Sequence, residues 1–134
     1  MTALHLTLPL PPSVNHSTRR HTITYTKNGK TCRRTMDVPN AKADKWMAQA
    51  KDICVDEMKR TGWVCRVDEK VVVDLTIHWP DRRRRDCHNL TGIIANCLEG
   101  VAVNDDRWML VRIRDFDVVG RGNECVDVTV RRAE

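Results

Sequence analysis

Residues 71–90 read VVVDLTIHWPDRRRRDCHNL, the most strongly patterned stretch of the chain. Every second residue of its first nine is apolar, which predicts a strand over residues 70–79. Four consecutive arginines follow this strand after Pro80 and Asp81, and they run into Asp86 and His88. Guanidinium groups bind phosphate oxygens through paired hydrogen bonds, and carboxylates hold the divalent cations that phosphoryl chemistry uses. The stretch therefore points to a site for a polyanion.

A helix is predicted immediately after the arginines. Apolar residues recur there at the i, i+3, i+4, i+7 and i+8 spacing of one helix face, namely Leu90, Ile93, Ile94, Cys97 and Leu98. Gly100 stands where a helix commonly ends, so the helix spans about residues 90–99. Asn89 is its expected N-cap, which places Asp86 and His88 just outside the positive end of a helix, where backbone N–H groups favour an anion.

The N-terminal part of the chain predicts a strand and a hairpin. Four leucines alternate with other residues over residues 4–10, and a proline within the run confines that strand to the edge of a sheet or to a strand end. Residues 22–27 and 30–35 flank Asn28 and Gly29, a pair that tolerates positive φ at both central positions of a tight turn. The hairpin is basic, so it is a candidate arm for reaching a ligand.

The rest of the chain completes an α+β pattern. Apolar residues recur at helical spacing over residues 41–60, with Asn40 as the expected N-cap. Alternating segments predict strands at about 110–119 and 124–131, joined by a glycine-rich turn. Because strands and helices do not alternate regularly, we expect a single small α+β domain over residues 1–134, in which a mixed, mostly antiparallel sheet of about five to six strands packs with two helices.

Length, charge and cysteine content narrow the class of protein. At 134 residues with 41% hydrophobic content the chain fits one modest core, and its net charge of +5 favours a nucleic-acid or other acidic partner. The six cysteines include no CxxC pair, so the sequence predicts neither a zinc knuckle nor a disulfide framework. A signal peptide and a membrane span are not predicted either. We therefore expect a soluble protein of the reducing cytoplasm that has no membrane partner.

A second acidic segment, Asn104-Asp105-Asp106, follows the predicted helix and precedes Arg107. Hydrolysis of a phosphodiester at neutral pH with oxygen ligands needs at least two acidic groups around a divalent cation. Asp86 offers one, and the intervening helix is expected to bring the two acidic segments together. Simpler interpretations stay open, because aspartates are common at helix N-termini and in turns, and an arginine run is often a solvated surface for a nucleic acid or a protein.

Three segments taken together resemble the RusA family of endodeoxyribonucleases, which are small Holliday junction resolvases of phages and prophages. They read LPLPPSVN over residues 8–15, PDRRRRDCHNL over residues 80–90 and NDD over residues 104–106. Their order and rough spacing match the family over most of the chain. The central motif is specific, because it joins an arginine-rich strand end, an Asp-x-acidic-Asn motif, an amphipathic helix and an Asp pair. Only a basic hairpin and a helix can be matched over residues 16–70.

The resemblance implies a homodimer, in the cytoplasm of a bacterial or phage-infected host cell, that holds a four-way DNA junction and makes paired nicks with Mg²⁺ or Mn²⁺. It implies that Asp86 is the first catalytic aspartate and Asp106 the last, and that Asp105 assists at the metal or orients its loop. Asn89 belongs to the shared motif without an assigned role. Arg85 would contact phosphate, and the wider DNA-binding set comprises Arg82, Arg83, Arg84, Arg85 and Arg107.

Two positions depart from the family pattern. His88 stands where the family has a second carboxylate, and Gly92 stands where a catalytic lysine is expected. Neutral imidazole still binds divalent metals, so His88 remains a candidate catalytic residue and metal ligand, with a preference for Mn²⁺ over Mg²⁺. Arg107 and Arg84 are the candidates to take over the role of the lysine. The alternative function is a catalytically impaired protein that only binds branched DNA, and a third is a basic interaction module for an acidic protein.

Overall fold

The computed structural model describes residues 3–12, 18–39 and 41–133. Within these ranges the chain forms six strands and two α-helices, which confirms the α+β class. In chain order the elements are β1 (Ala3–Leu8), β2 (Thr18–Lys27), β3 (Lys30–Pro39), α1 (Ala41–Thr61), β4 (Val71–Trp79), the 3-10 helix η2 (Cys87–Leu90), α2 (Thr91–Leu98), the 3-10 helix η3 (Asp106–Trp108), β5 (Met109–Val118) and β6 (Cys125–Arg132).

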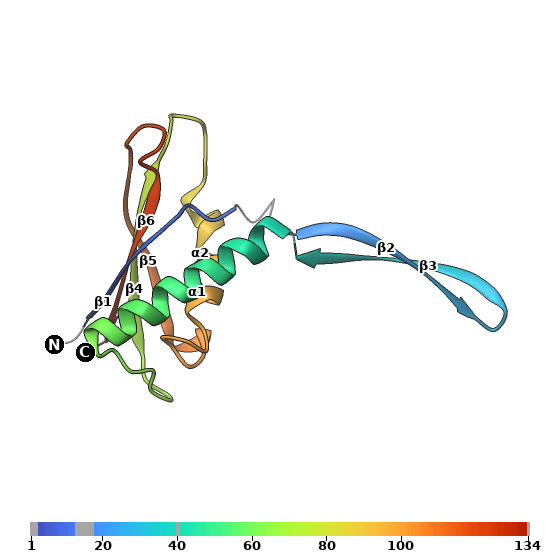
Figure 1. The fold of residues 1–134 in the computed structure, drawn as a ribbon, viewed down its shortest axis with the longest axis horizontal. Helices are drawn as coiled ribbons and strands as arrows, with labels where there is room; N and C mark the ends of the chain where they lie inside the picture. The colour runs from blue at the N-terminus through green and yellow to red at the C-terminus, as the bar shows by residue number, and fades with distance from the viewer. Residues whose placement is uncertain (1–2, 13–17, 40, 134) are drawn as a thin grey trace.

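Four strands form a mixed sheet in the order β1-β6-β4-β5, and β2 and β3 form a separate hairpin. β6 pairs antiparallel with both β1 and β4, whereas β4 and β5 are parallel. Parallel neighbours need a crossover, and here the chain from β4 passes through η2 and α2 before it enters β5. β1 lies at the edge of the sheet, as expected for a strand followed at once by Pro9. The crossover (Figure 1) covers residues 80–108, and this range includes the arginines and both acidic segments.

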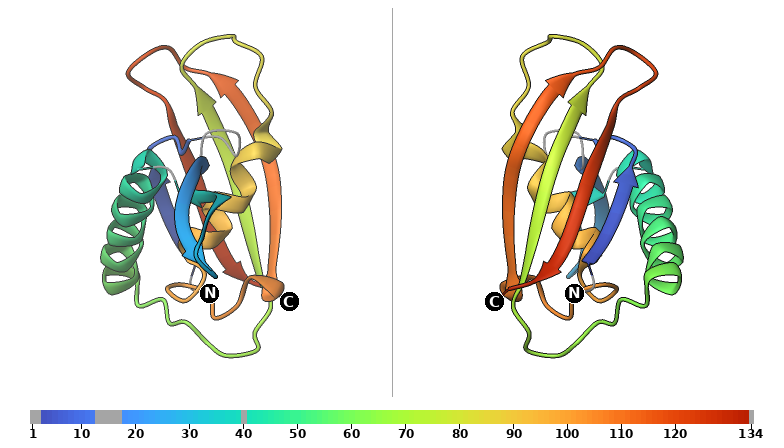
Figure 2. Two further views of the ribbon diagram at one scale, coloured as in Figure 1. Left: turned by 90° about the vertical axis from the view of Figure 1, so that its right-hand side faces the viewer. Right: turned by 90° about the vertical axis from the view of Figure 1, so that its left-hand side faces the viewer.

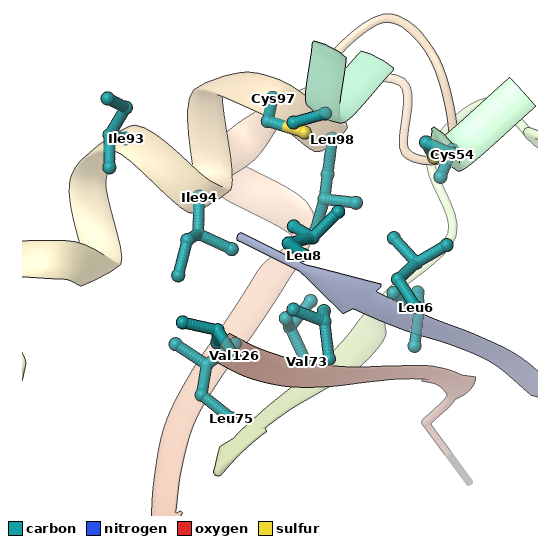
Figure 3. Close-up of a cluster of buried hydrophobic side chains, with 14 of the residues drawn as sticks. Leu6, Leu8, Cys54, Val73, Leu75, Ile93, Ile94, Cys97, Leu98 and Val126 are labelled. Atoms are coloured by element: carbon teal, nitrogen blue, oxygen red, sulfur yellow. The ribbon is translucent and has the colours of Figure 1, made fainter. Parts of the chain in front are cut away.

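Both α-helices pack on one face of this sheet (Figures 1 and 2). α1 buries a stripe at three- and four-residue spacing, made of Ala43, Trp46, Ala50 and Cys54. Trp46 also donates a hydrogen bond from Nε1 to the Pro9 carbonyl at 2.8 Å, which ties α1 to the end of β1. Figure 3 shows part of the core, with the labelled side chains Leu6, Leu8, Cys54, Val73, Leu75, Ile93, Ile94, Cys97, Leu98 and Val126.

The opposite face of the sheet carries no helix among the described residues (Figure 2, right). Its side chains are mainly polar, as is common for a sheet with one face toward water. Asp74 of β4 is buried there beneath three arginines. The N to O distances are 3.5, 3.8 and 3.3 Å for Arg112, Arg114 and Arg131 respectively. This uncovered face is therefore a separate surface with its own charges.

The β2–β3 hairpin extends away from the sheet as an arm (Figure 1). Asn28 and Gly29 form its tip with φ angles of 54° and 77°, which confirms the predicted turn. The strands are longer than predicted, because pairing continues outward to Thr18 and Pro39. Side chains over residues 22–34 are almost all exposed, so the arm buries little surface of its own.

Outside the hairpin, the predicted element boundaries hold to within two residues. The start of the second helix differs, because η2 precedes α2 and Asp86 caps it by accepting a hydrogen bond from the His88 N–H at 2.9 Å. The prediction of Asn89 as N-cap was therefore wrong, since Asn89 lies inside η2. Asn40, the expected cap of α1, lies outside the described residues. No helix in the described part of the chain is long and apolar enough to cross a membrane.

Candidate active site

A cleft of about 1080 Å³ opens where the crossover leaves β4. Its walls come from the end of β4, the loop before η2, η2 itself and β5. The apolar wall includes Trp79, Leu90, Ile113 and Phe116, and the polar wall consists of Arg84, Arg85, Asp86, His88 and Asn89. The cleft therefore places two guanidiniums, one carboxylate and one imidazole beside a hydrophobic surface.

Asp86 and His88 are exposed side chains held by the start of η2. Oδ1 of Asp86 accepts the hydrogen bond from the His88 backbone N–H, whereas Oδ2 has no partner within the described ranges. This local hydrogen bond fixes the direction of the carboxylate relative to the backbone of His88. One carboxylate oxygen and one imidazole ring are therefore available to a ligand in the cleft.

Arg85 is held in place by its own loop. It donates from Nη1 to Asp81 Oδ1 at 2.6 Å, and its guanidinium lies over the Trp79 ring, 5.2 Å from the centroid. The backbone N–H of Arg83 donates to the same carboxylate at 3.0 Å. The hydrogen bond from Arg85 and then that from Arg83 lower the pKa of the Asp81 carboxyl to about 2. The Arg85 cation is therefore presented to the cleft in a restrained orientation.

Arg82 and Arg84 differ from Arg85, because both are exposed and neither side chain forms an ion pair with a residue in the described ranges. Arg83 is an intermediate case, with its Nε 3.7 Å from Asp81 and its side chain 74% exposed. Arg84 also lines the cleft. Arg82 and Arg84 are therefore the two members of the run whose guanidiniums are free to bind phosphate.

The second acidic segment belongs to a cluster of Glu99, Asp105 and Asp106, here called the acidic trio, in which each residue offers a carboxylate oxygen within 4.8 Å of the others. Asp105 caps η3 by accepting the Arg107 N–H at 3.1 Å, and the Asp106 N–H donates to Glu99 Oε2 at 3.2 Å. The Arg107 guanidinium approaches Asp105 at 3.7 Å and Asp68 at 3.6 Å. Oxygen ligands at this spacing suit Mg²⁺ or Mn²⁺.

Within one chain the acidic trio lies far from Asp86 and His88. Asp86 caps the start of η2 and Glu99 caps the end of α2, so about 20 Å of helix separates the two acidic segments. The cause is the crossover, because α2 runs back along the parallel pair β4 and β5. The expectation that the helix would bring the two segments together was therefore wrong for a single chain.

Glu99 is a candidate site residue that the sequence motifs do not identify. It directly follows the last residue of α2, where the negative end of the helix dipole disfavours a carboxylate. A glutamate at that unfavourable position, followed closely by Asp105 and Asp106, was the signal available in the sequence. The structure shows that its carboxylate bridges the gap to η3.

Gly92 lies in the first turn of α2 and is exposed. A Cβ added there would meet no atom within 4 Å, so the chain has room for a side chain at this position. Of the two arginines considered as replacements for the missing lysine, Arg84 lies in the cleft with Asp86, whereas Arg107 lies at the acidic trio. The geometry therefore favours Arg84 for a role beside Asp86.

A family model described as endodeoxyribonuclease RusA matches residues 9–131, nearly the whole chain. The matched range contains every residue of the cleft and of the acidic trio. A comparison with curated proteins gave no match.

Proposed function

The chain belongs to the endodeoxyribonuclease RusA family, and we propose that it resolves four-way DNA junctions by metal-dependent hydrolysis in the cleft beside Asp86. Members of this family are Holliday junction resolvases that depend on divalent metals, so the protein is an endodeoxyribonuclease. The observation that supports the location is the cleft itself. There the unpaired guanidinium of Arg84 and the free carboxylate oxygen of Asp86 face one cavity.

Exposed cations supply the grip on DNA. Arg82 and Arg84 bind backbone phosphates, and Arg85 presents a restrained guanidinium to the phosphate in the cleft. The hairpin arm extends these interactions away from the cleft, because its exposed residues include Lys27, Lys30, Arg33 and Arg34. An extended basic arm suits a branched substrate, which offers phosphates on more than one duplex.

We assign the ligands of the divalent cation, Mg²⁺ or Mn²⁺, to both ends of α2. Asp86 and His88 offer one carboxylate oxygen and one imidazole at the cleft, and Asp105 and Asp106 offer carboxylates within the acidic trio. When bound, the cation activates water and neutralises charge that develops on the phosphate. Asp86, His88 and Asp106 are the proposed catalytic residues, and Glu99 orients the Asp106 segment through its hydrogen bond to the Asp106 N–H.

In a homodimer, ligands that lie far apart in one chain can meet in one site. A two-fold axis that sets the α2 helices of two copies antiparallel brings the start of one helix beside the end of the other. Asn96, midway along α2, is exposed, so the helix keeps one side free for such an approach. Asp86 of one subunit and the acidic trio of the other then form one site. The dimer carries two such sites, one for each of the paired nicks.

Cleavage of a synthetic four-way junction tests the proposal. Asp86→Asn should abolish cleavage and leave junction binding intact, because binding depends on the cations. Asp52→Asn changes an exposed aspartate of α1 and is the matched control, which should cleave like the parent. Equal cleavage by Asp86→Asn and the parent would refute the assignment.

The alternative function, binding of branched DNA without cleavage, predicts a different experimental result. The changes at His88 and Gly92 favour a protein that binds branched DNA without cutting it. Tight, salt-sensitive binding by the parent, with no cleavage of any branched DNA in Mg²⁺ or Mn²⁺, would establish that alternative. Cleavage in either metal that Asp86→Asn abolishes excludes it.

A further inference from the structure

A second cluster of metal-binding side chains lies on the uncovered face of the sheet. It consists of His78 of β4, Cys125 and Asp127 of β6, and Asp117 of β5. In the strand register, His78 is directly opposite both Cys125 and Asp117. Directly opposed residues on neighbouring strands project to the same face, and in an antiparallel pair such as β4 and β6 their Cβ atoms are about 5 Å apart. Strand pairing therefore gathers these side chains at one point.

The imidazole of His78 is held between two carboxylates. Nδ1 lies 2.6 Å from Asp117 Oδ1, and Nε2 lies 2.8 Å from Asp127 Oδ2. The His78 side chain is only 19% exposed, so packing also restrains the ring. One ligand atom each from His78, Cys125 and Asp127 lie within 4.8 Å of one another. The hydroxyl of Thr7 donates to Asp127 Oδ1 at 3.2 Å, which orients that carboxylate.

We propose that this cluster is a zinc site, in which His78 Nε2, Cys125 Sγ and Asp127 Oδ2 bind the ion. Histidines that bind metals almost always donate their other ring N–H to a carboxylate, a carbonyl or a water, and Asp117 stands in that position at Nδ1. Thr7 holds the remaining oxygen of Asp127 in the same supporting way. The site is independent of the proposed nuclease function, since none of these residues lines the cleft or belongs to the acidic trio.

The ligand types select zinc over the cation of the nuclease. A thiolate, an imidazole and a carboxylate suit Zn²⁺, whereas Mg²⁺ prefers oxygen ligands alone. Tetrahedral bonds of about 2.0 to 2.3 Å place ligand atoms roughly 3.5 Å apart, so shifts of about 1 Å in the side chains suffice to close the site. Three protein ligands leave one position for water. Zinc replaces the protons on Nε2 and Sγ, which pass to solvent.

Zinc at this point would join β4 to β6 where the arginine loop begins. His78 immediately precedes Trp79, the last residue of β4, and Cys125 is the first residue of β6. A ligand that binds only the folded chain stabilises it, and this one would do so beside the base of the loop that carries Arg82 to Arg85. Zinc should therefore raise the melting temperature of the protein.

Metal titration of the purified protein under reducing conditions tests the site. With Co²⁺ as a spectroscopic substitute, we expect one equivalent to produce a thiolate-to-metal charge-transfer band that Zn²⁺ abolishes by displacing Co²⁺. Cys125→Ser should remove the band, and Cys65→Ser, a matched change at another partly exposed free thiol, should keep it. Asp117→Asn should weaken zinc affinity about 10- to 100-fold, because it removes the carboxylate charge that orients the imidazole and raises its basicity. Asp86→Asn should leave the band unchanged.

Two results would overturn the zinc site. The first is a parent protein that binds no zinc, and the second is a charge-transfer band that survives Cys125→Ser. If Cys125→Ser does not fold, the zinc affinity of Asp117→Asn decides. Unchanged zinc affinity in this variant would mean that Asp117 pairs with His78 only to hold the fold together, and it would also overturn the site.

Discussion

The two ends of α2 carry opposite electrostatic characters. At its start, Asp86 is the only carboxylate among the described residues that line the cleft, where it lies beside the guanidiniums of Arg84 and Arg85. At its end, the acidic trio gathers three carboxylates, and Arg107 there is already engaged by acidic partners. The first end suits a phosphate and the second suits a metal ion. Neither end alone supplies what phosphodiester hydrolysis needs, so the function depends on how the two are combined.

A mixed dimer of two inactive variants is the strongest way to test that combination. Asp86→Asn and Asp106→Asn should each lower junction cleavage by at least about 100-fold, since each removes a proposed metal ligand from every site. When the two variants are co-expressed with different tags and the mixed dimer is purified, one of its sites regains both aspartates. We expect the mixed dimer to nick the junction once without making the paired cut.

The reciprocal pairing is the control for this measurement. A dimer of the parent with the double variant, Asp86→Asn and Asp106→Asn in one chain, leaves one aspartate missing from each shared site and should be inactive. Sites built from a single chain predict the reverse, with an active parent and double-variant dimer and no rescue in the mixed dimer. Gel analysis of nicked and resolved products distinguishes the two patterns.

Measurements of DNA affinity compare one arginine at each end of α2. Arg84→Ala should weaken junction binding and reduce the slope of log affinity against log salt by about 0.9 for each phosphate that the protein no longer neutralises. Arg107→Ala should have a smaller effect, because its guanidinium is engaged by Asp105 and Asp68. Fluorescence anisotropy over a series of salt concentrations measures both slopes. Equal changes of affinity and slope in the two variants would show that these ion pairs do not restrain Arg107.

Substitutions of Gly92 test whether a cation at the start of α2 would speed cleavage. Gly92→Lys and Gly92→Ala each remove a glycine from a helix, which by itself should stabilise the protein by up to about 1 kcal/mol. The lysine should gain less than the alanine, because the positive end of the helix disfavours a cation. A Cβ at residue 92 meets no atom within 4 Å in the chain. Only lysine adds charge near the cleft, so Gly92→Lys should cleave junctions faster than Gly92→Ala. Thermal unfolding and cleavage rates of the pair separate stability from catalysis. Equal cleavage rates would exclude a cationic role at this position.

Much of the sheet could be predicted because burial on one face imposes a period of two. β6 shows that alternation along most of its length and β4 shows it over residues 75–79, and both strands lie within one residue of the predicted ones. The length of the two strands in the β2–β3 arm was underestimated for the opposite reason. Over residues 22–34 both of its faces are exposed, so no burial pattern marks the extent of its strands, and only the turn at Asn28 and Gly29 marks its place.

The surroundings of Asp86 could be predicted because its neighbours are consecutive in the chain. The separation between Asp86 and Asp106 could not be predicted, because it depends on which strands are parallel. The sequence predicts a mixed sheet without identifying β4 and β5 as the parallel pair, and it is this pair that forces the two ends of α2 apart. The cluster around His78 likewise depends on the register of three strands, which no local pattern reveals.

The smallest effect concerns Asp81, which restrains Arg85 at the cleft end. The carboxyl pKa of Asp81 is lowered to about 2, first by the hydrogen bond from Arg85 and then by the Arg83 backbone N–H. Because the folded-state pKa lies below the unfolded value, this interaction stabilises the fold above the unfolded pKa, and the contribution disappears as pH falls through about 2. The arginine loop should therefore keep its shape in moderately acidic solution.

An NMR titration of the Asp81 carboxyl measures this restraint directly. We expect a midpoint near 2 in the parent and a higher midpoint in Arg85→Ala, while Arg82→Ala, which removes an unpaired neighbour, should leave the midpoint almost unchanged. A parent midpoint at the ordinary aspartate value would mean that Asp81 does not hold Arg85. Arg85 would then be as free as Arg84, and the cleft end would carry two mobile cations in place of one restrained and one free.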